Sequence, residues 1–476
     1  MSVTSTFPLF NAPTTPCLPQ MVVLNITQQN IRNHYRSLLA TIQEKPIYIY
    51  VYGPAGTGKT ALFRALQEDT NEFFKFPKAC LPMASTGTAA LNVAGRTIHS
   101  ALSIPINDEE AFSAPTPRMR KTLKITLEGV RVAFVDEISL VSSLLFHQMS
   151  AYMQLGRGGS AKPFGGISMV LFGDLLQLEP VTHGAVYEAL PLEFKALRDA
   201  SYPCVTENLW GLFRMMRLHK NVRVEEQEDA KHLNALREDE IPDETETFFK
   251  RFCRVRDTTH GGLFEELDEL RASWPEKEFI MLAPQNETVD RLNEFRIARM
   301  PDSIKMRWLK VERNEAEKVE EWIETSRWAR PLTLAPGCKV TLVTTIDKRR
   351  KLVNGAIGRI KKIYPNTLVI DFPEVNNVIM ERSHFRIQKR DNDYFWFKQF
   401  PIREAEAMTI HNSQGRTVDG VVVYSRGLFM PGLMYTALSR ARSLKLCRIS
   451  HVEPENWKVA AHARDAVTQM RKRKAS

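Results

Sequence analysis

The sequence has no uninterrupted apolar run of the length that crosses a bilayer, so no membrane partner is expected. Residues 1–20 have no basic stretch and contain four prolines, which differs from a secretory signal and predicts a flexible leader. Cysteine is also scarce: the six cysteines lie far apart and form no CxxC pair. This spacing argues against a disulfide scaffold or a zinc knuckle, and it favours a reducing compartment.

Acidic residues are outnumbered by basic ones, and the formal net charge is +10 at pH 7. This excess favours a polyanionic partner, although the same charge spread over the surface would also serve solubility alone. The basic residues gather in four clusters, at 118–124, 348–351, 359–362 and 471–474. The last cluster, Arg-Lys-Arg-Lys, has the composition of a nuclear import signal. We therefore predict a nuclear location, with a viral or transposon-borne origin as the alternative.

A chain of 476 residues is too long for one hydrophobic core, which predicts two or three domains. Apolar runs without alternation are typical of strands that are covered on both faces. Such runs occur at 47–51, 130–135, 167–172, 279–282 and 421–424. Helical stretches separate several of them, so we expect parallel sheets with helices on both faces. The runs form an early and a late group, which predicts two such sheets.

The domain boundaries are expected where this pattern is interrupted. We predict a flexible leader at 1–20, a first α/β domain at 21–200 with a short wedge-like insertion at about 104–126, a second α/β domain made of 201–300 and 399–460, an inserted domain at 301–398, and a basic tail at 461–476. The inserted domain should begin with a charged helix at about 303–329 and continue as a small β-barrel, because short strands with turn signals follow. Its tryptophans are expected to pack in the core rather than to stack on bases.

A glycine-rich loop directly follows the first predicted strand. It reads Gly53, Pro54, Ala55, Gly56, Thr57, Gly58, Lys59, Thr60, and an apolar helical run comes next. The glycines allow successive backbone N–H groups to curl around phosphate oxygens, and the following helix points its positive end at them. Lys59 is placed to reach the β- and γ-phosphates, and Thr60 to bind Mg²⁺. The sequence therefore predicts binding of ATP and Mg²⁺.

Two carboxylates end the second predicted strand, where ligands bind in an open α/β sheet. Asp136 is expected to hold Mg²⁺, and Glu137 to orient and deprotonate the attacking water. Gln177 follows the third strand and is suited to sensing a γ-phosphate. Together these residues predict ATP hydrolysis.

The chain resembles the Pif-type ("petite integration frequency") DNA helicases of superfamily one, group B, from about residue 22 to about residue 452. The motifs that carry the likeness are LNITQ (24–28), GPAGTGKT (53–60), STGTAALNVAGRTIHS (85–100), VDEISLVSS (135–143), FGGISMVLFGDLLQLEP (164–180), NVR (221–223), LAPQNETVDRLN (282–293), NGAIG (354–358), TIHNSQGRTVDG (409–420) and YTALSRARS (435–443). The resemblance implies two RecA-like P-loop NTPase domains, with a small SH3-like β-barrel inserted in the second.

The resemblance also implies further roles at the nucleotide. Gln28 would read the adenine, while Arg223 and Arg440 would reach the γ-phosphate from the second domain. Such arginines stabilise the negative charge of the transferred phosphoryl group. They would also make hydrolysis depend on closure of the interdomain cleft.

A strand-binding channel across both domains is implied as well. Its residues would be Thr97, His99 and Ser100 in the first domain and Thr409, His411 and Ser413 in the second. Donors of this kind suit phosphate oxygens and carry no base information. The resemblance thus implies a monomeric motor that moves 5′ to 3′ on single-stranded DNA, acts on forked duplexes, and serves replication, repair or recombination.

Three positions depart from the family pattern. Asn412 stands where the family usually has Lys, Val224 where it has Gln, and Glu179 where it has Pro. None is a phosphate-site residue, so the departures concern the strength of unwinding. The loss of a cation at Asn412 is expected to weaken DNA binding.

Two other functions fit the same sequence. One is an ATPase that remodels protein–DNA complexes without separating strands, which a translocation assay beside a strand-displacement assay would reveal. The other is a nucleotide-dependent binding module without catalysis. The presence of Lys59, Glu137 and Arg440 argues against the binding module.

Overall fold

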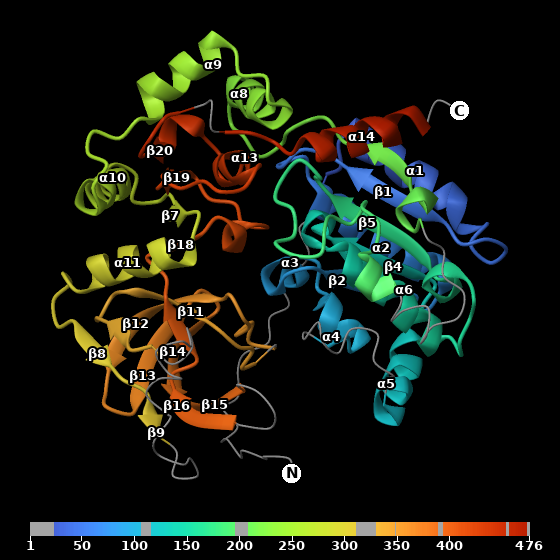
Figure 1. The fold of residues 1–476 in the computed structure, drawn as a ribbon, viewed down its shortest axis with the longest axis horizontal. Helices are drawn as coiled ribbons and strands as arrows, with labels where there is room; N and C mark the ends of the chain where they lie inside the picture. Colours follow the sequence, from blue (N-terminus) through green and yellow to red (C-terminus); the bar gives the residue numbers. More distant parts are fainter. Residues whose placement is uncertain are drawn as a thin grey trace.

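The computed structural model describes residues 23–105, 116–195, 208–310, 330–347, 349–388, 394–453 and 457–473. Two parallel sheets with flanking helices lie beside each other, and an antiparallel body lies below the second sheet (Figure 1). We call the part built on the first parallel sheet the first half. The part built on the second parallel sheet is the second half.

The first half holds a six-stranded parallel sheet with the order β3-β2-β4-β5-β1-β6. Its strands are β1 (Tyr48–Tyr52), β2 (Cys80–Ala84), β3 (Arg96–Thr97), β4 (Val132–Asp136), β5 (Ser168–Gly173) and β6 (Arg214–Arg217). Successive strand residues point to opposite faces, and in this sheet both faces are apolar. Helices α1 (Ile26–Leu39) and α2 (Lys59–Phe74) pack on one face. The other face is covered by α4 (Ile98–Leu102), α5 (Pro117–Leu127), α6 (Ser143–Gly156) and α14 (Ala461–Arg473).

The second half holds a four-stranded parallel sheet with the order β18-β7-β19-β20. Its strands are β7 (Phe279–Ala283), β18 (Ala407–Thr409), β19 (Gly420–Val423) and β20 (Arg448–Ile449). Helices α8 (Gln227–Glu238) and α13 (Leu433–Leu438) share one apolar core with this sheet, while α10 (His260–Ser273) and α11 (Asn286–Ile297) share another. A short helix, α9 (Asp243–Phe248), follows α8.

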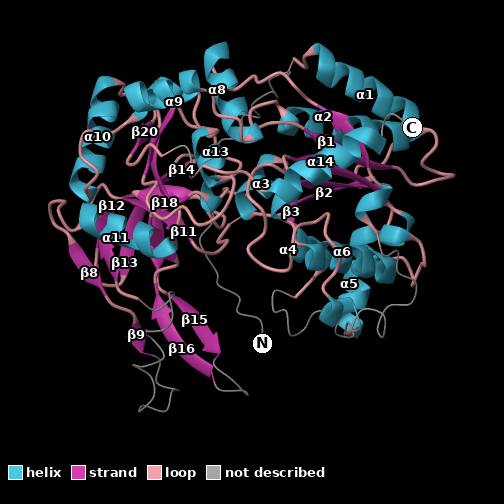
Figure 2. Cartoon of the chain, turned by 45° about the horizontal axis from the view of Figure 1, so that its top comes forward, coloured by secondary structure: helices cyan, strands magenta, loops and turns pink. Residues whose placement is uncertain are grey.

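The antiparallel body contains a five-stranded sheet with the order β14-β13-β12-β11-β17. Its strands are β11 (Lys339–Leu342), β12 (Ile357–Ile363), β13 (Thr367–Phe372), β14 (Val375–Glu381) and β17 (Ile402–Glu404). The hairpin of β15 (Ser383–Gln388) and β16 (Tyr394–Gln399) projects away from the rest of the molecule (Figure 2). This body lies where the inserted domain was predicted, and its description as an SH3-like barrel stays a prediction.

The predicted fold class is confirmed: the protein is α/β with two parallel sheets. Each of the five predicted apolar strands is present, with ends displaced by at most two residues. The apolar pattern was sufficient because each of these strands is covered on both faces.

The prediction of a helix beginning at 303 is wrong for the described residues. Residues Ile304–Met306 form β8 and Leu309–Lys310 form β9. These strands pair with β10 (Leu332–Leu334) and with β16, so pairing with distant strands overrides the local helical preference. Residues 311–329 of the predicted helix lie outside the described residues.

Two predicted boundaries are also wrong. Strand β6 lies inside the range expected for the second domain, yet it pairs with β1 at the edge of the first sheet. The expected basic tail is helix α14, whose side chains Ala463, Val467 and Met470 are buried in the core of the first half. Their spacing places them on one face of the helix, which the surrounding Lys and Arg residues had obscured.

The predicted wedge-like insertion is described only in part. Residues 106–115 lie outside the described ranges, and α5 occupies the remainder. Leu123 and Leu127 of α5 are buried in the core of the first half, so this helix belongs to the layer that covers the sheet.

Candidate nucleotide site and DNA interface

The predicted phosphate loop lies between β1 and α2, at the carboxyl edge of the first sheet. Gly56 and Gly58 have φ values of +79° and +74°, a region that suits glycine. A Cβ atom on Gly58 would also lie 2.4 Å from Nε2 of Gln28. The backbone conformation therefore favours glycine at position 58, and a side chain there would displace the Gln28 amide.

Gln28 braces the phosphate loop. Its Nε2 donates to the carbonyls of Thr57 at 3.1 Å and Gly58 at 3.2 Å, and its Oε1 accepts from the Asn25 N–H at the start of α1. Both N–H groups of the amide are thus used by the protein. The predicted reading of adenine stays a prediction, and it requires this amide to exchange at least one of these partners.

Residues 221–222, which follow strand β6, also hold the phosphate loop through two hydrogen bonds. Nδ2 of Asn221 donates to the Ala55 carbonyl at 3.2 Å, and the Val222 N–H donates to the Gly56 carbonyl at 2.8 Å. Arg223, the next residue, is therefore fixed close to the loop.

Lys59 begins α2, and its Nζ donates to the carbonyls of Gly53 at 2.8 Å and Pro54 at 2.9 Å. Burial lowers the pKa of Lys59, while the carboxylates of Asp174 and Glu137 act in the opposite direction. The ammonium group is thus surrounded by oxygen atoms at the mouth of the loop.

Asp136 and Glu137 lie where β4 ends. Burial and then the charge of Glu137 raise the pKa of Asp136 to about 7. Glu137 has a φ of +52°, which is uncommon for a residue other than glycine, and its Oε2 is buried without a hydrogen-bond partner. Adjacent buried carboxylates at this edge of the sheet suit a divalent cation, so Asp136 fits the predicted Mg²⁺ role, with Thr60 as the second predicted ligand.

Both predicted arginines bond to the end of α13 in the second half. Nε of Arg440 donates to the Thr436 carbonyl at 2.9 Å, and its Nη2 donates to Oγ of Ser439 at 2.7 Å. Nη1 of Arg223 donates to the Ser439 carbonyl. Burial lowers the pKa of both arginines, and the carboxylate of Glu137 is close enough to oppose this shift in each.

Gln177 joins the first half to the predicted DNA-binding loop. It is 4% exposed, and its Oε1 accepts from Nε2 of Gln414 at 3.4 Å. Gln414 belongs to the TIHNSQG segment, so the predicted γ-phosphate sensor directly contacts the predicted DNA loop.

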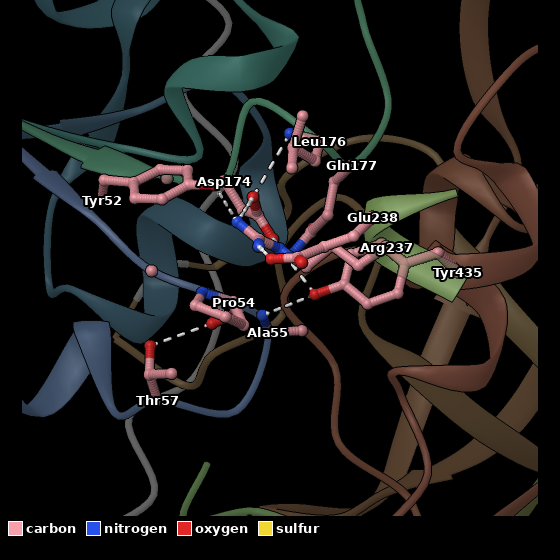
Figure 3. Close-up of polar contacts among 12 residues, drawn as sticks. Tyr52, Pro54, Ala55, Thr57, Asp174, Leu176, Gln177, Arg237, Glu238 and Tyr435 are labelled. Atoms are coloured by element: carbon pink, nitrogen blue, oxygen red, sulfur yellow. Dashed lines mark hydrogen bonds and ion pairs between the residues drawn. The ribbon is translucent and has the colours of Figure 1, made fainter. Parts of the chain in front are cut away.

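A buried ion pair was not predicted from the sequence. Arg237 of α8 donates to both carboxylate oxygens of Asp174, at 2.9 and 3.0 Å (Figure 3). The hydroxyl of Tyr435 donates to Asp174 Oδ2 at 3.1 Å and accepts from the Ala55 N–H at 3.0 Å. Asp174 and Tyr435 lie inside the GDLLQ and YTALSRARS motifs, whereas no motif marked Arg237.

Two of the three predicted DNA-binding residues in the second half face a cavity. The cavity has a volume of about 400 Å³, and Thr409, His411 and Asn412 contribute to its lining. Thr86 and Thr88 line it from the first half, near the start of α3 (Gly87–Asn92). Segments from both halves thus meet at one opening.

Ser413 does not face this cavity. It is fully buried, and its Oγ donates to the Ile410 carbonyl at 2.6 Å. In this structure Ser413 closes a turn, so its hydroxyl is not presented to a DNA strand as the prediction requires.

The three predicted residues of the first half lie together at the start of α4. Oγ1 of Thr97 accepts from the Ser100 N–H at 3.3 Å, and Oγ of Ser100 donates to the Thr97 carbonyl at 3.1 Å. His99 lies between them and is half-buried. They do not line the 400 Å³ cavity, so the structure does not join the two predicted DNA patches into one opening.

The TIHNSQG segment (residues 409–415) and the Arg416 that follows it contact other parts of the molecule. Nδ2 of Asn92 in α3 donates to the Gly415 carbonyl at 3.1 Å, and Nη2 of Arg416 donates to the Gly355 carbonyl at 2.6 Å. The segment and Arg416 therefore contact the antiparallel body and two places in the first half, one of which is the predicted γ-phosphate sensor Gln177.

Within the described ranges, no group of three or more His, Cys, Asp or Glu side chains is placed to hold a metal. No helix within those ranges is both long and apolar enough to cross a membrane.

A sequence model of the PIF1-like helicase family matches residues 23–257, which include the phosphate loop, both carboxylates, Gln177 and Arg223. This part of the chain belongs to the PIF1-like helicases. This confirms the family that the ten motifs indicated.

Several relatives of the family match most of the chain. The ATP-dependent DNA helicase PIF1 of Danio rerio is 26% identical over 91% of this chain, and the Pif1 helicase of Bdellovibrio bacteriovorus is 27% identical over 83%. This chain spans 63% of the length of the Danio rerio relative and 82% of the bacterial one.

Solved structures of family members share the fold. The Pif1 helicase of Candida albicans has a TM-score of 0.70 and 22% identity, and the match covers 95% of this chain and all of that one. A Bacteroides Pif1 bound to single-stranded DNA has the same TM-score and identity, covering 95% of this chain and 98% of that one. The arrangement of the two parallel sheets and the antiparallel body is thus the arrangement of these helicases.

Proposed function

We propose that this protein is an ATP-dependent DNA helicase that hydrolyses ATP in the cleft between its two halves and moves along single-stranded DNA. The observation that carries the proposal is that Glu137 of the first half lies within electrostatic reach of both Lys59 in the same half and Arg440 in the second half. An ATPase whose site is completed by two separate bodies can convert hydrolysis into relative movement.

Each residue of the site has a chemical role in this proposal. Lys59 and the loop N–H groups bind the β- and γ-phosphates, and Glu137 accepts the proton of the attacking water. Thr60 and Asp136 hold Mg²⁺, which supplies charge neutralisation at the phosphates. Arg223 and Arg440 stabilise the charge that develops on the transferred phosphoryl group.

Coupling to DNA is proposed to pass through the TIHNSQG segment. Thr409 and His411 offer donors to a DNA backbone, while Gln414 contacts Gln177 at the nucleotide site. A shift of this segment on DNA would therefore change the contact at Gln177. Thr97, His99 and Ser100 are proposed as the contacts of the first half.

The finer properties of the motor rest on the family. We propose movement 5′ to 3′, unwinding of forked duplexes, action as a monomer, and a nuclear role in replication, repair or recombination. The exposed basic end of α14 supports the nuclear location.

The ATPase rate with and without single-stranded DNA, measured on the wild type and on Glu137→Gln, tests the proposal. DNA should stimulate the wild type strongly, and the substitution should abolish the activity by removing the base. Duplexes carrying a 5′ or a 3′ single-stranded tail then give the polarity. Translocation that leaves every duplex intact would replace the helicase with the remodelling ATPase, and a rate indifferent to DNA would refute coupling.

A further inference from the structure

We infer that Tyr435 is a positioning residue of the ATPase reaction, because its hydroxyl group fixes the phosphate loop of the first half to the arginine-bearing helix of the second. The inference rests on the proposed function. Tyr435 donates to Asp174 at 3.1 Å and accepts from the Ala55 N–H at 3.0 Å, so one oxygen joins the loop to a buried ion pair (Figure 3).

The contacts of Tyr435 form only when the two halves are together. Ala55 and Asp174 belong to the first half, and Tyr435 and Arg237 are carried by α13 and α8 of the second. When the cleft opens, the Ala55 N–H loses this partner and Asp174 loses its ion pair with Arg237. The hydrogen bonds of the phosphate loop therefore differ between the closed and the open cleft.

The residues of this contact are buried, and their environment determines their protonation states. Asp174 is fully buried, and Arg237 and Tyr435 are 2% and 3% exposed. Burial alone would raise the pKa of Asp174, but the charge and hydrogen bonds of Arg237 lower it, so the carboxylate is ionised and accepts from Tyr435. Burial and Asp174 raise the pKa of Tyr435, which keeps the phenol protonated. Hydrogen bonds in such a low-dielectric site are strong when complete and costly when incomplete.

The same helix sets the position of Arg440. Gly432, the residue before α13, lies so close to Gln177 that a Cβ atom would approach its carbonyl to 2.7 Å. Tyr435 follows within the helix, and Arg440 comes two residues after its end and donates back to the Thr436 carbonyl. A helix that is docked on the phosphate loop through Tyr435 therefore brings Arg440 to the phosphates in a fixed place.

The substitution Tyr435→Phe removes only the hydroxyl group, and Tyr35→Phe is its matched control. Tyr35 is also fully buried with a bonded hydroxyl, 2.6 Å from Oγ1 of Thr70, but it lies on α1 away from the cleft. Tyr435→Phe should lower kcat for DNA-stimulated ATP hydrolysis about tenfold while the KM for ATP changes little, because the loop still binds nucleotide when the cleft is open. Tyr35→Phe should lower the Tm about as much as Tyr435→Phe does, but it should leave kcat unchanged.

Amide hydrogen exchange on the two folded variants gives a second readout. The Ala55 N–H should exchange faster in Tyr435→Phe, with strand β4 unchanged, and should keep the wild-type rate in Tyr35→Phe. Equal kcat values in the two variants, or unchanged exchange at Ala55, would overturn the inference. A wild type without ATPase activity would instead refute the proposed function, so the two failures are separable.

Discussion

At the scale of single residues, Glu137 combines two unfavourable features at one position. Its backbone is left-handed, and one carboxylate oxygen is buried without a partner. Strain of this kind is found at functional sites, where the surrounding structure maintains it.

Glu137→Asn should therefore be inactive yet more stable than the wild type. Asn tolerates the left-handed conformation and removes the buried charge, so a gain of about 1 kcal/mol in the free energy of unfolding is expected. Denaturant unfolding measures it, with Asp302→Asn, a left-handed residue in an exposed turn, as the control. A loss of stability in Glu137→Asn would show that the carboxylate is not strained.

His411 predicts a pH dependence of stability. Burial lowers the pKa of His411 below its ordinary value of about 6.5, and its Nε2 is buried without a hydrogen-bond partner. A histidine with a depressed folded pKa contributes stability that is present above the unfolded pKa and lost as the pH falls through the folded one. The wild-type Tm should thus fall more between about pH 7.5 and about pH 5 than that of His411→Gln. His34→Gln, at an exposed position, should follow the wild type.

Asn412 offers a gain of function. It is exposed and lines the 400 Å³ cavity, and the family usually has Lys at this position. Asn412→Lys should tighten binding of single-stranded DNA and steepen the logarithmic dependence of affinity on salt by about 0.7, the value for one added phosphate contact. Asn33→Lys adds the same charge on α1, and an equal effect there would mean that position 412 does not contact the strand.

At the scale of helices and strands, α14 is the element that changes the domain description most. Its apolar face completes the core of the first half, and His462 binds Glu179 at 2.8 Å. Glu179 is one of the departures from the family pattern, and its role here is to anchor this helix.

Met470→Ala should destabilise the protein by about 2 to 4 kcal/mol, because Met470 is buried and its loss leaves a cavity. Denaturant unfolding of this variant would be compared with that of Arg471→Ala, whose side chain is exposed. Equal midpoints for the two variants would mean that α14 does not pack in solution as described.

The sequence was informative where structure is decided locally. Apolar runs that are covered on both faces predicted the strands β1, β4, β5, β7 and β19. The phosphate loop was predicted because its backbone conformation needs glycine. Strands β8 and β9 and helix α14 were missed because distant partners decide them. The same holds at the site, where Arg237 carries no local signal because its partner Asp174 lies far away in the sequence. Ser413 differs, because its hydroxyl bonds to a carbonyl only three residues away and the motif did not reveal its burial.

At the scale of the whole molecule, the buried pair Asp174–Arg237 holds the two halves together. Breaking a buried ion pair by removing one partner costs about 3 to 5 kcal/mol, because the other charge stays buried. Separation of the halves would relieve this cost by exposing Asp174 to water.

Arg237→Leu should therefore shift the protein toward an open cleft. The radius of gyration from small-angle X-ray scattering should increase relative to the wild type. Arg464→Leu is the control, because Arg464 pairs with Asp239 at 3.5 Å in a more exposed position. An unchanged radius in Arg237→Leu would mean that other contacts suffice to keep the cleft closed.

The return of α14 to the first half also restricts how the halves can turn. The chain leaves the first half after β6 and comes back between Trp457, in the core of the second half, and Val459, in that of the first. Two bodies joined by one connection can rotate relative to each other in all directions. With two connections, the main rotation left is about the line that passes through both connections. These connections pass close together, since α14 packs beside β6 and Arg464 reaches the end of α8. The relative motion of the two halves should accordingly be a hinge motion with its axis near α8 and its widest opening far from α8.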